Sequence, residues 1–170
     1  REILSLTDEK FEDETDYVAG LLHNLGKLIL AITFPDLFEQ VYQKKDRQTE
    51  DFLSLESKTI GWNHAKIGAY YLWNHHISDD IVEAVHWHHE PLRSERHQKL
   101  AGAIQVADFI TTGIGVKGLV RLSSRNENSH SELDGWKILF EHKSPQEMEA
   151  IEHELNDTVE RISQTLHGIL

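Results

Sequence analysis

Residues 16–32, DYVAGLLHNLGKLILAI, decide the fold class of the chain. Apolar side chains recur there with the 3.6-residue period of an α-helix, at positions 18, 21, 22, 25, 28, 29 and 32. Leu30 and Ala19 fall on other sides, so the pattern predicts a central helix that is apolar almost all round. The segment also places His23 beside Asn24. An imidazole next to a neutral amide, rather than a carboxylate, raises the question of whether the chain still performs chemistry.

Glycine and proline divide most of the remaining chain into further helices. Pro35 should end the first helix and begin a second, because proline is tolerated at the first helical position. Asn63 and Ser78 are good N-cap residues for two later helices. The expected helices cover about residues 50–60, 64–75, 79–89 and 99–112. The sequence has no useful β-alternation and no internal repeat, so it predicts an all-α protein.

The C-terminal segment carries the clearest local signal. Ser144 and Glu147 form a capping box with Pro145 at the first helical position, which predicts an amphipathic helix over residues 144–169. Its apolar stripe consists of Met148, Ile151, Leu155, Val159, Ile162, Leu166 and Ile169. The stripe could form a coiled-coil seam in a homodimer, but packing on the domain is the favoured alternative. The preceding stretch 123–135 has no apolar period and is predicted to be a loop.

Composition limits the classes of function. A length of 170 residues suits one domain, and a net charge of −12 argues against binding to nucleic acid or to an anionic membrane surface. No run of about 18 uninterrupted apolar residues predicts a membrane span. The absence of cysteine is compatible with a cytoplasmic location. The unusual count is 12 histidines, more than an α-rich protein commonly needs for structure.

Helical spacing separates the histidines of the run EAVHWHHEP, residues 83–91. His88 and His89 lie three and four residues from the apolar side of this helix, whereas His86 aligns with the polar side. Burying two adjacent imidazoles is costly unless a partner accepts their lone pairs. A divalent metal ion does so, because neutral imidazole is a good ligand for Zn, Fe, Ni and Cu.

Three more residues lie at buried edges of other helices. His64 begins a helix in which Gly68 leaves room for another backbone or a ligand. Asp108 interrupts an apolar stripe and should be paired or act as a ligand. His23 is flanked by small residues that permit close approach. Each of these is more often structural when taken singly, but their joint occurrence predicts a shared site. The remaining histidines are assigned to the surface: His75, His76, His97, His130, His142, His153 and His167.

The order LLHNLGK, then Glu56 followed by IGWNHAKIGAYYLW, then ISDDIVEAVHWHHEP and LAGAIQVADFI, resembles the HDOD domain. That family is the HD-related output domain of bacterial signalling proteins, within the HD superfamily of metal-dependent phosphohydrolases. The resemblance implies an HD-like bundle of about six to eight helices in one domain over residues 1–170. Some of the family's N-terminal helices are expected to be missing before residue 1.

The resemblance also implies roles for individual residues. His23 matches the histidine of the HD dyad, and Asn24 stands where the dyad has its aspartate. His64, His88 and His89 match the later histidines, while Asp108 matches the final carboxylate. A further upstream histidine of the family has no counterpart in residues 1–22.

Three interpretations follow. The favoured one is a bacterial, cytoplasmic signalling module that binds a protein partner and has lost hydrolase activity, with or without one metal ion. The second is a phosphohydrolase that uses a single Zn, Fe, Ni or Mn ion held by three imidazoles. The third is a structural domain whose histidines hydrogen-bond to one another and to Asp108. Hydrolysis of cyclic di-GMP is not expected, because EPLRSERHQKL lacks the Gly-Tyr-Pro element of such phosphodiesterases.

Overall fold

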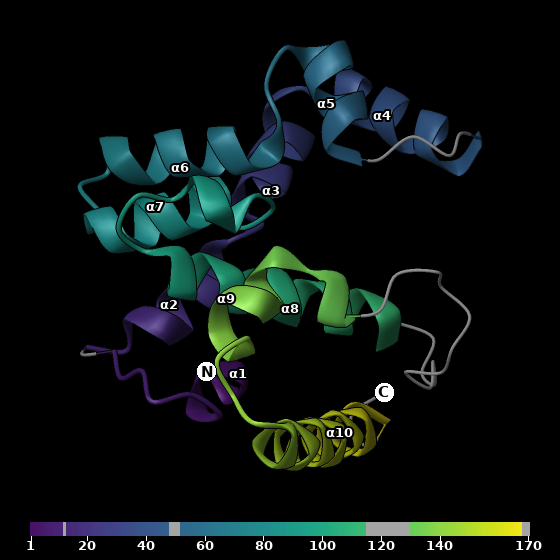
Figure 1. Cartoon of the computed structure of the whole chain (residues 1–170). Helices are drawn as coiled ribbons and strands as arrows, with labels where there is room; N and C mark the ends of the chain where they lie inside the picture. The colour runs from purple at the N-terminus through teal and green to yellow at the C-terminus, as the bar shows by residue number, and fades with distance from the viewer. Residues whose placement is uncertain (12, 48–51, 115–129, 168–170) are drawn as a thin grey trace.

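The computed structural model describes residues 1–11, 13–47, 52–114 and 130–167, and all regular structure in these ranges is helical (Figure 1). This confirms the predicted all-α class. The α-helices are α1 (Glu2–Ser5), α2 (Thr15–Leu22), α3 (Leu25–Thr33), α4 (Pro35–Arg47), α5 (Phe52–Ile60), α6 (His64–Asn74), α7 (Asp79–Trp87), α8 (Gln98–Ile114), α9 (Asp134–Phe140) and α10 (Pro145–His167). Short 3-10 turns cover Pro91–Arg93 and His130–Glu132.

The predicted helix over 16–32 is divided into α2 and α3, and it is not central. The break falls at His23 and Asn24, where Asn24 leaves helical geometry at φ −98° and ψ 11°. Leu21, Leu28 and Ile32 are 69%, 57% and 72% exposed. The prediction of a central helix is therefore wrong. Neighbouring helices pack against one side of α2 and α3 and leave the other side open to solvent.

A close helix crossing positions the N-terminus of α6 against α3. A Cβ atom added to Gly26 would lie 1.9 Å from the carbonyl oxygen of His64, so only glycine fits there. The opposing residue is Gly68, whose own added Cβ would lie 3.1 Å from the Gly26 nitrogen. The room predicted at Gly68 thus accommodates another backbone. The crossing brings His64 close to the break at residues 23–24.

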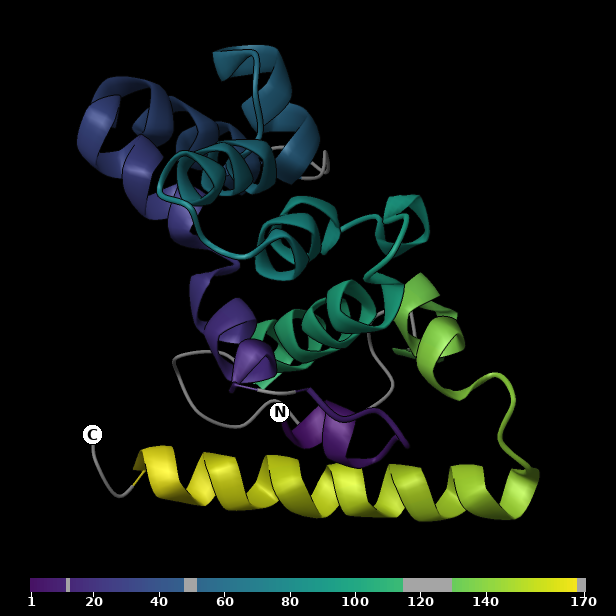
Figure 2. The same ribbon diagram turned by 90° about the vertical axis from the view of Figure 1, so that its left-hand side faces the viewer.

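Helix α8 supplies much of the core. In both Figure 1 and Figure 2 it runs through the middle of the lower half of the molecule, with α9 beside it and α10 below. Its Leu100, Ala101 and Val106 are at most 1% exposed. Helix α9 was not predicted. It begins at residue 134, so the last two residues of the predicted loop 123–135 are helical. The part of that loop before residue 130 lies outside the described residues.

The capping box of α10 is formed as predicted. The backbone N–H of Ser144 donates to the Glu147 carboxylate over 2.8 Å, and the Glu147 N–H lies 3.4 Å from the Ser144 hydroxyl. Ile151 and Leu155 are buried in the same core as residues of α1, whereas Ile162 is 40% exposed. The first half of the predicted stripe therefore packs on the domain. A homodimer through the second half stays a prediction.

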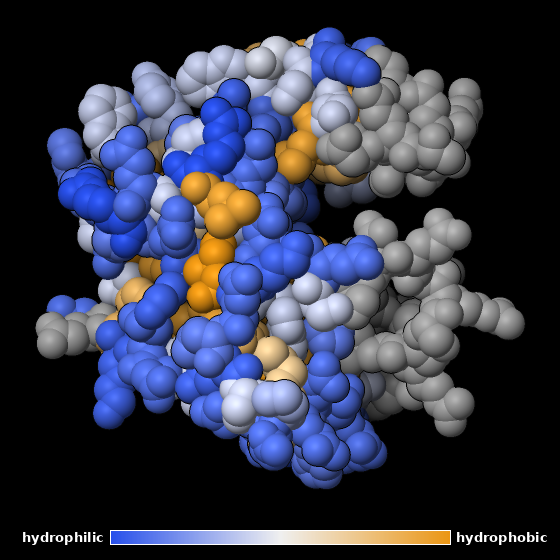
Figure 3. All heavy atoms as spheres, in the orientation of Figure 1, coloured by the Kyte–Doolittle hydropathy of each residue, from blue (hydrophilic) through white to orange (hydrophobic). Residues whose placement is uncertain are grey.

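The face in Figure 3 is mostly hydrophilic, with a narrow apolar band down its middle, as the charge-rich composition leads one to expect. Within the described ranges, no single helix has the length and apolar character needed to cross a membrane. One pair of segments, Thr15–Thr33 with Pro35–Gln43, reaches that length and composition when taken together, but it is bent by 114°.

Candidate metal centre

His64 is held in place by a carboxylate from the preceding helix. Asn63 caps α6 by accepting the Lys66 N–H over 3.0 Å, which confirms the predicted N-cap and fixes the first turn. The backbone N–H of His64 and its Nδ1–H donate to Glu56 Oε2 over 2.8 and 2.7 Å. The turn from α5 reaches α6 through Gly61, whose φ of +92° suits glycine. Since Nδ1 donates, Nε2 carries the free lone pair.

His88 and His89 lie in the turn that follows α7, not inside the predicted helix over 79–89. His88 is fully buried, and its Nδ1–H donates to the carbonyl oxygen of Val85 over 2.7 Å. Its Nε2 atom is buried and has no hydrogen-bond partner among the described residues. The Nε2 atom of His89 lies 3.0 Å from the Nε2 atom of His64. Because the proton of His64 lies on Nδ1, the His89 Nε2–H is the donor in this contact and the His64 Nε2 lone pair accepts it.

The structure brings His64, His88 and His89 together with one ring nitrogen from each within 4.8 Å of the others. A tetrahedral Zn²⁺ ion with Zn–N distances of about 2.0–2.1 Å requires ligand nitrogens about 3.3 Å apart, so small shifts of the rings suffice. Hydrogen bonds from Nδ1 to a carboxylate and to a backbone carbonyl are the usual means of orienting metal-binding imidazoles. The orphaned, buried Nε2 of His88 shows that the residues present fit a divalent metal ion.

Burial keeps these imidazoles in the neutral form that binds metals. It lowers the pKa of His88 well below its ordinary value, and the nearby His89 lowers it further. Burial, reinforced by His64, lowers the pKa of His89 to about 4. Burial also lowers the pKa of His64, although Glu56 offsets part of this effect. At neutral pH the cluster therefore presents uncharged nitrogen donors.

His23, Asn24 and Asp108 form a second group beside the three-histidine cluster. The Nδ1–H of His23 donates to the Gly20 carbonyl over 2.7 Å, which leaves the lone pair on Nε2. The Asn24 amide donates to that Nε2 over 2.7 Å, and an Asp108 oxygen lies 3.4 Å from it. Neither His23 nor Asp108 joins the three-nitrogen group.

A hollow of about 170 Å³ opens beside this second group. His23 and Asp108 line it together with apolar side chains of α1 and α8, and Arg1 and Asp16 contribute charged groups. Arg1 is paired with Asp16 over 3.3 Å. A small ligand in the hollow would therefore meet the dyad position without displacing any helix.

From sequence, Glu56 belongs to the motif order of the family resemblance but was assigned no role. In the structure it is fully buried and binds His64. Three histidines assigned to polar surroundings are also partly buried. His130 packs on the ring of Trp136 at 4.4 Å, and the Nε2 atoms of His130 and His86 are shielded from solvent. His97 lies 3.8 Å from Glu83. The side chain of His167 lies outside the described residues.

Comparisons with known proteins agree with this architecture. The model of the HDOD domain matches residues 1–91, so the match includes all four candidate histidines, His23, His64, His88 and His89, but stops before Asp108. An "Uncharacterized protein" of Treponema pallidum (strain Nichols) is 23% identical over 94 residues, which are 55% of this chain and 18% of that protein.

Two solved structures share the fold. One is described as a "Putative phosphohydrolase" from Shewanella amazonensis SB2B, with a TM-score of 0.61 and 21% identity over 86% of this chain and 52% of that one. The other, a "Putative signal transduction protein" from Marinobacter aquaeolei VT8, has a TM-score of 0.64 and 22% identity over 97% of this chain and 36% of that one. The chain therefore spans about half or less of the length of these relatives. Because the family model matches more than half of its residues, the chain belongs to the HDOD domain family.

Proposed function

We propose that the chain is a signalling output domain that holds one divalent metal ion at His64, His88 and His89 and lacks a two-metal hydrolase centre. One observation carries the proposal: the Asn24 amide donates to His23 Nε2 over 2.7 Å. A neutral donor thus occupies the lone pair that would otherwise be free to bind a metal. The partner is a protein, and the setting is a bacterial cytoplasm.

The argument rests on charge. A two-metal clamp stabilises the attacking and leaving oxygens of a displacement, and two divalent cations a few ångströms apart need anionic ligands between them. Asn24 supplies no negative charge, and Asp108 is the carboxylate beside His23. The three neutral imidazoles suit a single Zn, Fe, Ni or Mn ion. Such an ion would join α6 to the segment after α7 and stabilise the relative position of the two.

A second candidate is a phosphohydrolase that works with one metal ion. The hollow of about 170 Å³ beside His23 and Asp108 favours it, because a phosphate ester there would lie next to the cluster. When bound, the ion would supply Lewis acidity and lower the pKa of a bound water. His23 and Asp108 would position the ester and accept a proton. This candidate ranks second because Asn24 stands where the dyad has its carboxylate.

Phosphatase assays on metal-loaded protein test the proposal. Protein purified and then loaded separately with Zn, Mn, Fe or Ni is assayed with p-nitrophenyl phosphate and bis(p-nitrophenyl) phosphate. The expected result is no turnover above that of the His88→Ala variant. His153→Ala is the matched control, because that histidine is exposed on α10. Turnover that disappears in His88→Ala and persists in His153→Ala would establish the second candidate instead.

A further inference from the structure

An aromatic row lies along the outer side of α6, separate from the histidine cluster. Trp62, Tyr70 and Trp73 are 49%, 55% and 59% exposed. The ring centroids of Trp62 and Tyr70 are 5.9 Å apart, and those of Tyr70 and Trp73 are 6.1 Å apart. These distances are typical of interacting aromatic pairs. Exposure of three large rings in one row marks a surface that can bind a ligand.

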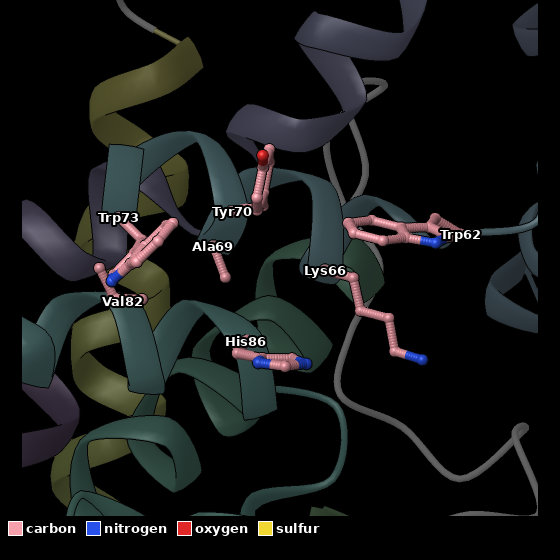
Figure 4. Close-up of a pocket in the computed structure, with 7 residues that line it drawn as sticks. All are labelled: Trp62, Lys66, Ala69, Tyr70, Trp73, Val82 and His86. Atoms are coloured by element: carbon pink, nitrogen blue, oxygen red, sulfur yellow. The ribbon is translucent and has the colours of Figure 1, made fainter. Parts of the chain in front are cut away.

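The row borders a hollow of about 280 Å³ between α6 and α7. In Figure 4, Trp62 and Trp73 lie at its two ends, and the small Ala69 faces His86 across it. Val82 of α7 completes the apolar lining. Because Ala69 fills little space opposite α7, the groove stays open. Its volume lies near the lower end of the range for small-molecule pockets, which suits one fused ring system.

Two polar groups in this lining lack partners. No hydrogen bond or ion pair joins the Lys66 ammonium group to another side chain in the described ranges. The Nε2 atom of His86 is shielded from solvent and has no hydrogen-bond partner there. An unpaired, shielded nitrogen is unfavourable unless a ligand bonds to it. Both groups belong to the same hollow as the aromatic row.

Among the residues that line the hollow, Lys66 is the one with a full charge at neutral pH, and it is positive although the whole chain is strongly negative. Outside the lining, Arg93 and Glu90 compensate each other through an ion pair of 3.2 Å. Aromatic cages commonly bind cations, but the Lys66 ammonium group would repel one. The site instead complements an anion.

We propose that this hollow is a binding site for a small aromatic carboxylate, with its ring against Trp62 and Trp73 and its carboxylate on Lys66. The Nε2 atom of His86, which is shielded and lacks a partner in the described ranges, forms a hydrogen bond with the same carboxylate. A single ammonium group matches a single carboxylate charge, and the apolar walls disfavour a multiply charged phosphate. The site does not rest on the metal-binding proposal, because none of its lining residues belongs to the three-histidine cluster.

Binding of 2-naphthoate, with the neutral 2-naphthamide as comparison, tests this proposal. The ligands are titrated into ¹⁵N-labelled protein, and the tryptophan indole N–H signals are followed by NMR. We expect the signals of Trp62 and Trp73 to shift with saturation. The signal of Trp136, which is 4% exposed in the core, should stay in place. Equal shifts of all three signals, or none, would overturn the proposal.

Variants separate the roles of charge and ring. Lys66→Met should weaken binding of 2-naphthoate about tenfold and leave 2-naphthamide unchanged, as expected for the loss of one charge-assisted contact. Lys137→Met removes the same charge from the exposed side of α9 and should change neither affinity. Trp73→Ala should weaken both ligands. The proposal is wrong if the parent binds the amide as tightly as the carboxylate, or if Lys66→Met and Lys137→Met behave alike.

Discussion

Replacement of Glu56 by glutamine should weaken metal binding without unfolding the chain. One oxygen of this fully buried carboxylate accepts two hydrogen bonds from His64, over 2.8 and 2.7 Å. Glutamine retains an acceptor oxygen but loses the charge. A hydrogen bond to a charged group contributes about 1.5–3 kcal/mol and a neutral one about 0.5–1.5 kcal/mol, so the expected loss is about 1–2 kcal/mol. That loss corresponds to roughly a 5- to 30-fold weaker affinity for the metal ion.

Competition for Zn²⁺ with a chromophoric chelator at neutral pH measures this effect. Glu83→Gln is the matched control, because Glu83 also accepts short hydrogen bonds, from Ser94 and from the backbone of Arg96, but does not touch the cluster. Both variants should lose stability, while only Glu56→Gln should lose metal affinity. The reasoning is refuted if folded Glu56→Gln binds Zn²⁺ as tightly as the parent, or if both variants weaken equally.

Three further predictions concern stability, each measured by urea unfolding. Gly26→Ala should lower the free energy of unfolding by about 3 kcal/mol or more, because its Cβ would meet the His64 carbonyl oxygen at 1.9 Å. Gly20→Ala is the control, with nothing within 4 Å of its Cβ, and should raise the free energy of unfolding by about 0.5–1 kcal/mol. Burial would raise the pKa of Glu83, but its hydrogen bonds hold the pKa below the ordinary value of 4.5. The contribution of Glu83 to the free energy of unfolding should therefore be present above pH 4.5 and decline as the pH falls further. This pH dependence should be absent in Glu83→Gln. Ser144→Ala should cost about 1 kcal/mol through the α10 cap; an unchanged unfolding midpoint would contradict this.

Helix starts were predictable because local chemistry sets them. Pro35 begins α4, Asn63 caps α6 through the Lys66 N–H, and Ser144 begins the box that caps α10. The break between α2 and α3 was not predictable, because no proline marks it. It coincides with the crossing of Gly26 and Gly68, a contact between segments far apart in the sequence. Tertiary contacts of this kind override a continuous helical period.

Helix α9 was missed for a related reason. The polar run before it hides its start, and the helix is only seven residues long. Its Trp136 and Phe140 are buried in the core, and its Gly135 makes a second close backbone crossing, with Gly102 of α8. Neither glycine alone predicts a partner, so no helix was predicted over residues 134–140.

In the histidine site, too, some residues could be predicted from the sequence and others could not. His64, His88 and His89 could be grouped from sequence because each lies at a buried edge of a helix, and the family resemblance orders them. The partners that orient them could not be assigned. Glu56 reaches His64 only after the chain turns at Gly61, and a backbone carbonyl accepts the Nδ1–H of His88.

The most direct test of the account is the number of metal ions bound per chain. Protein loaded with excess Zn²⁺, freed of unbound ion and analysed by mass spectrometry of its metal content should hold one ion, and His88→Ala should hold none. No bound ion in the parent, two ions per chain, or one ion retained by His88→Ala would contradict it.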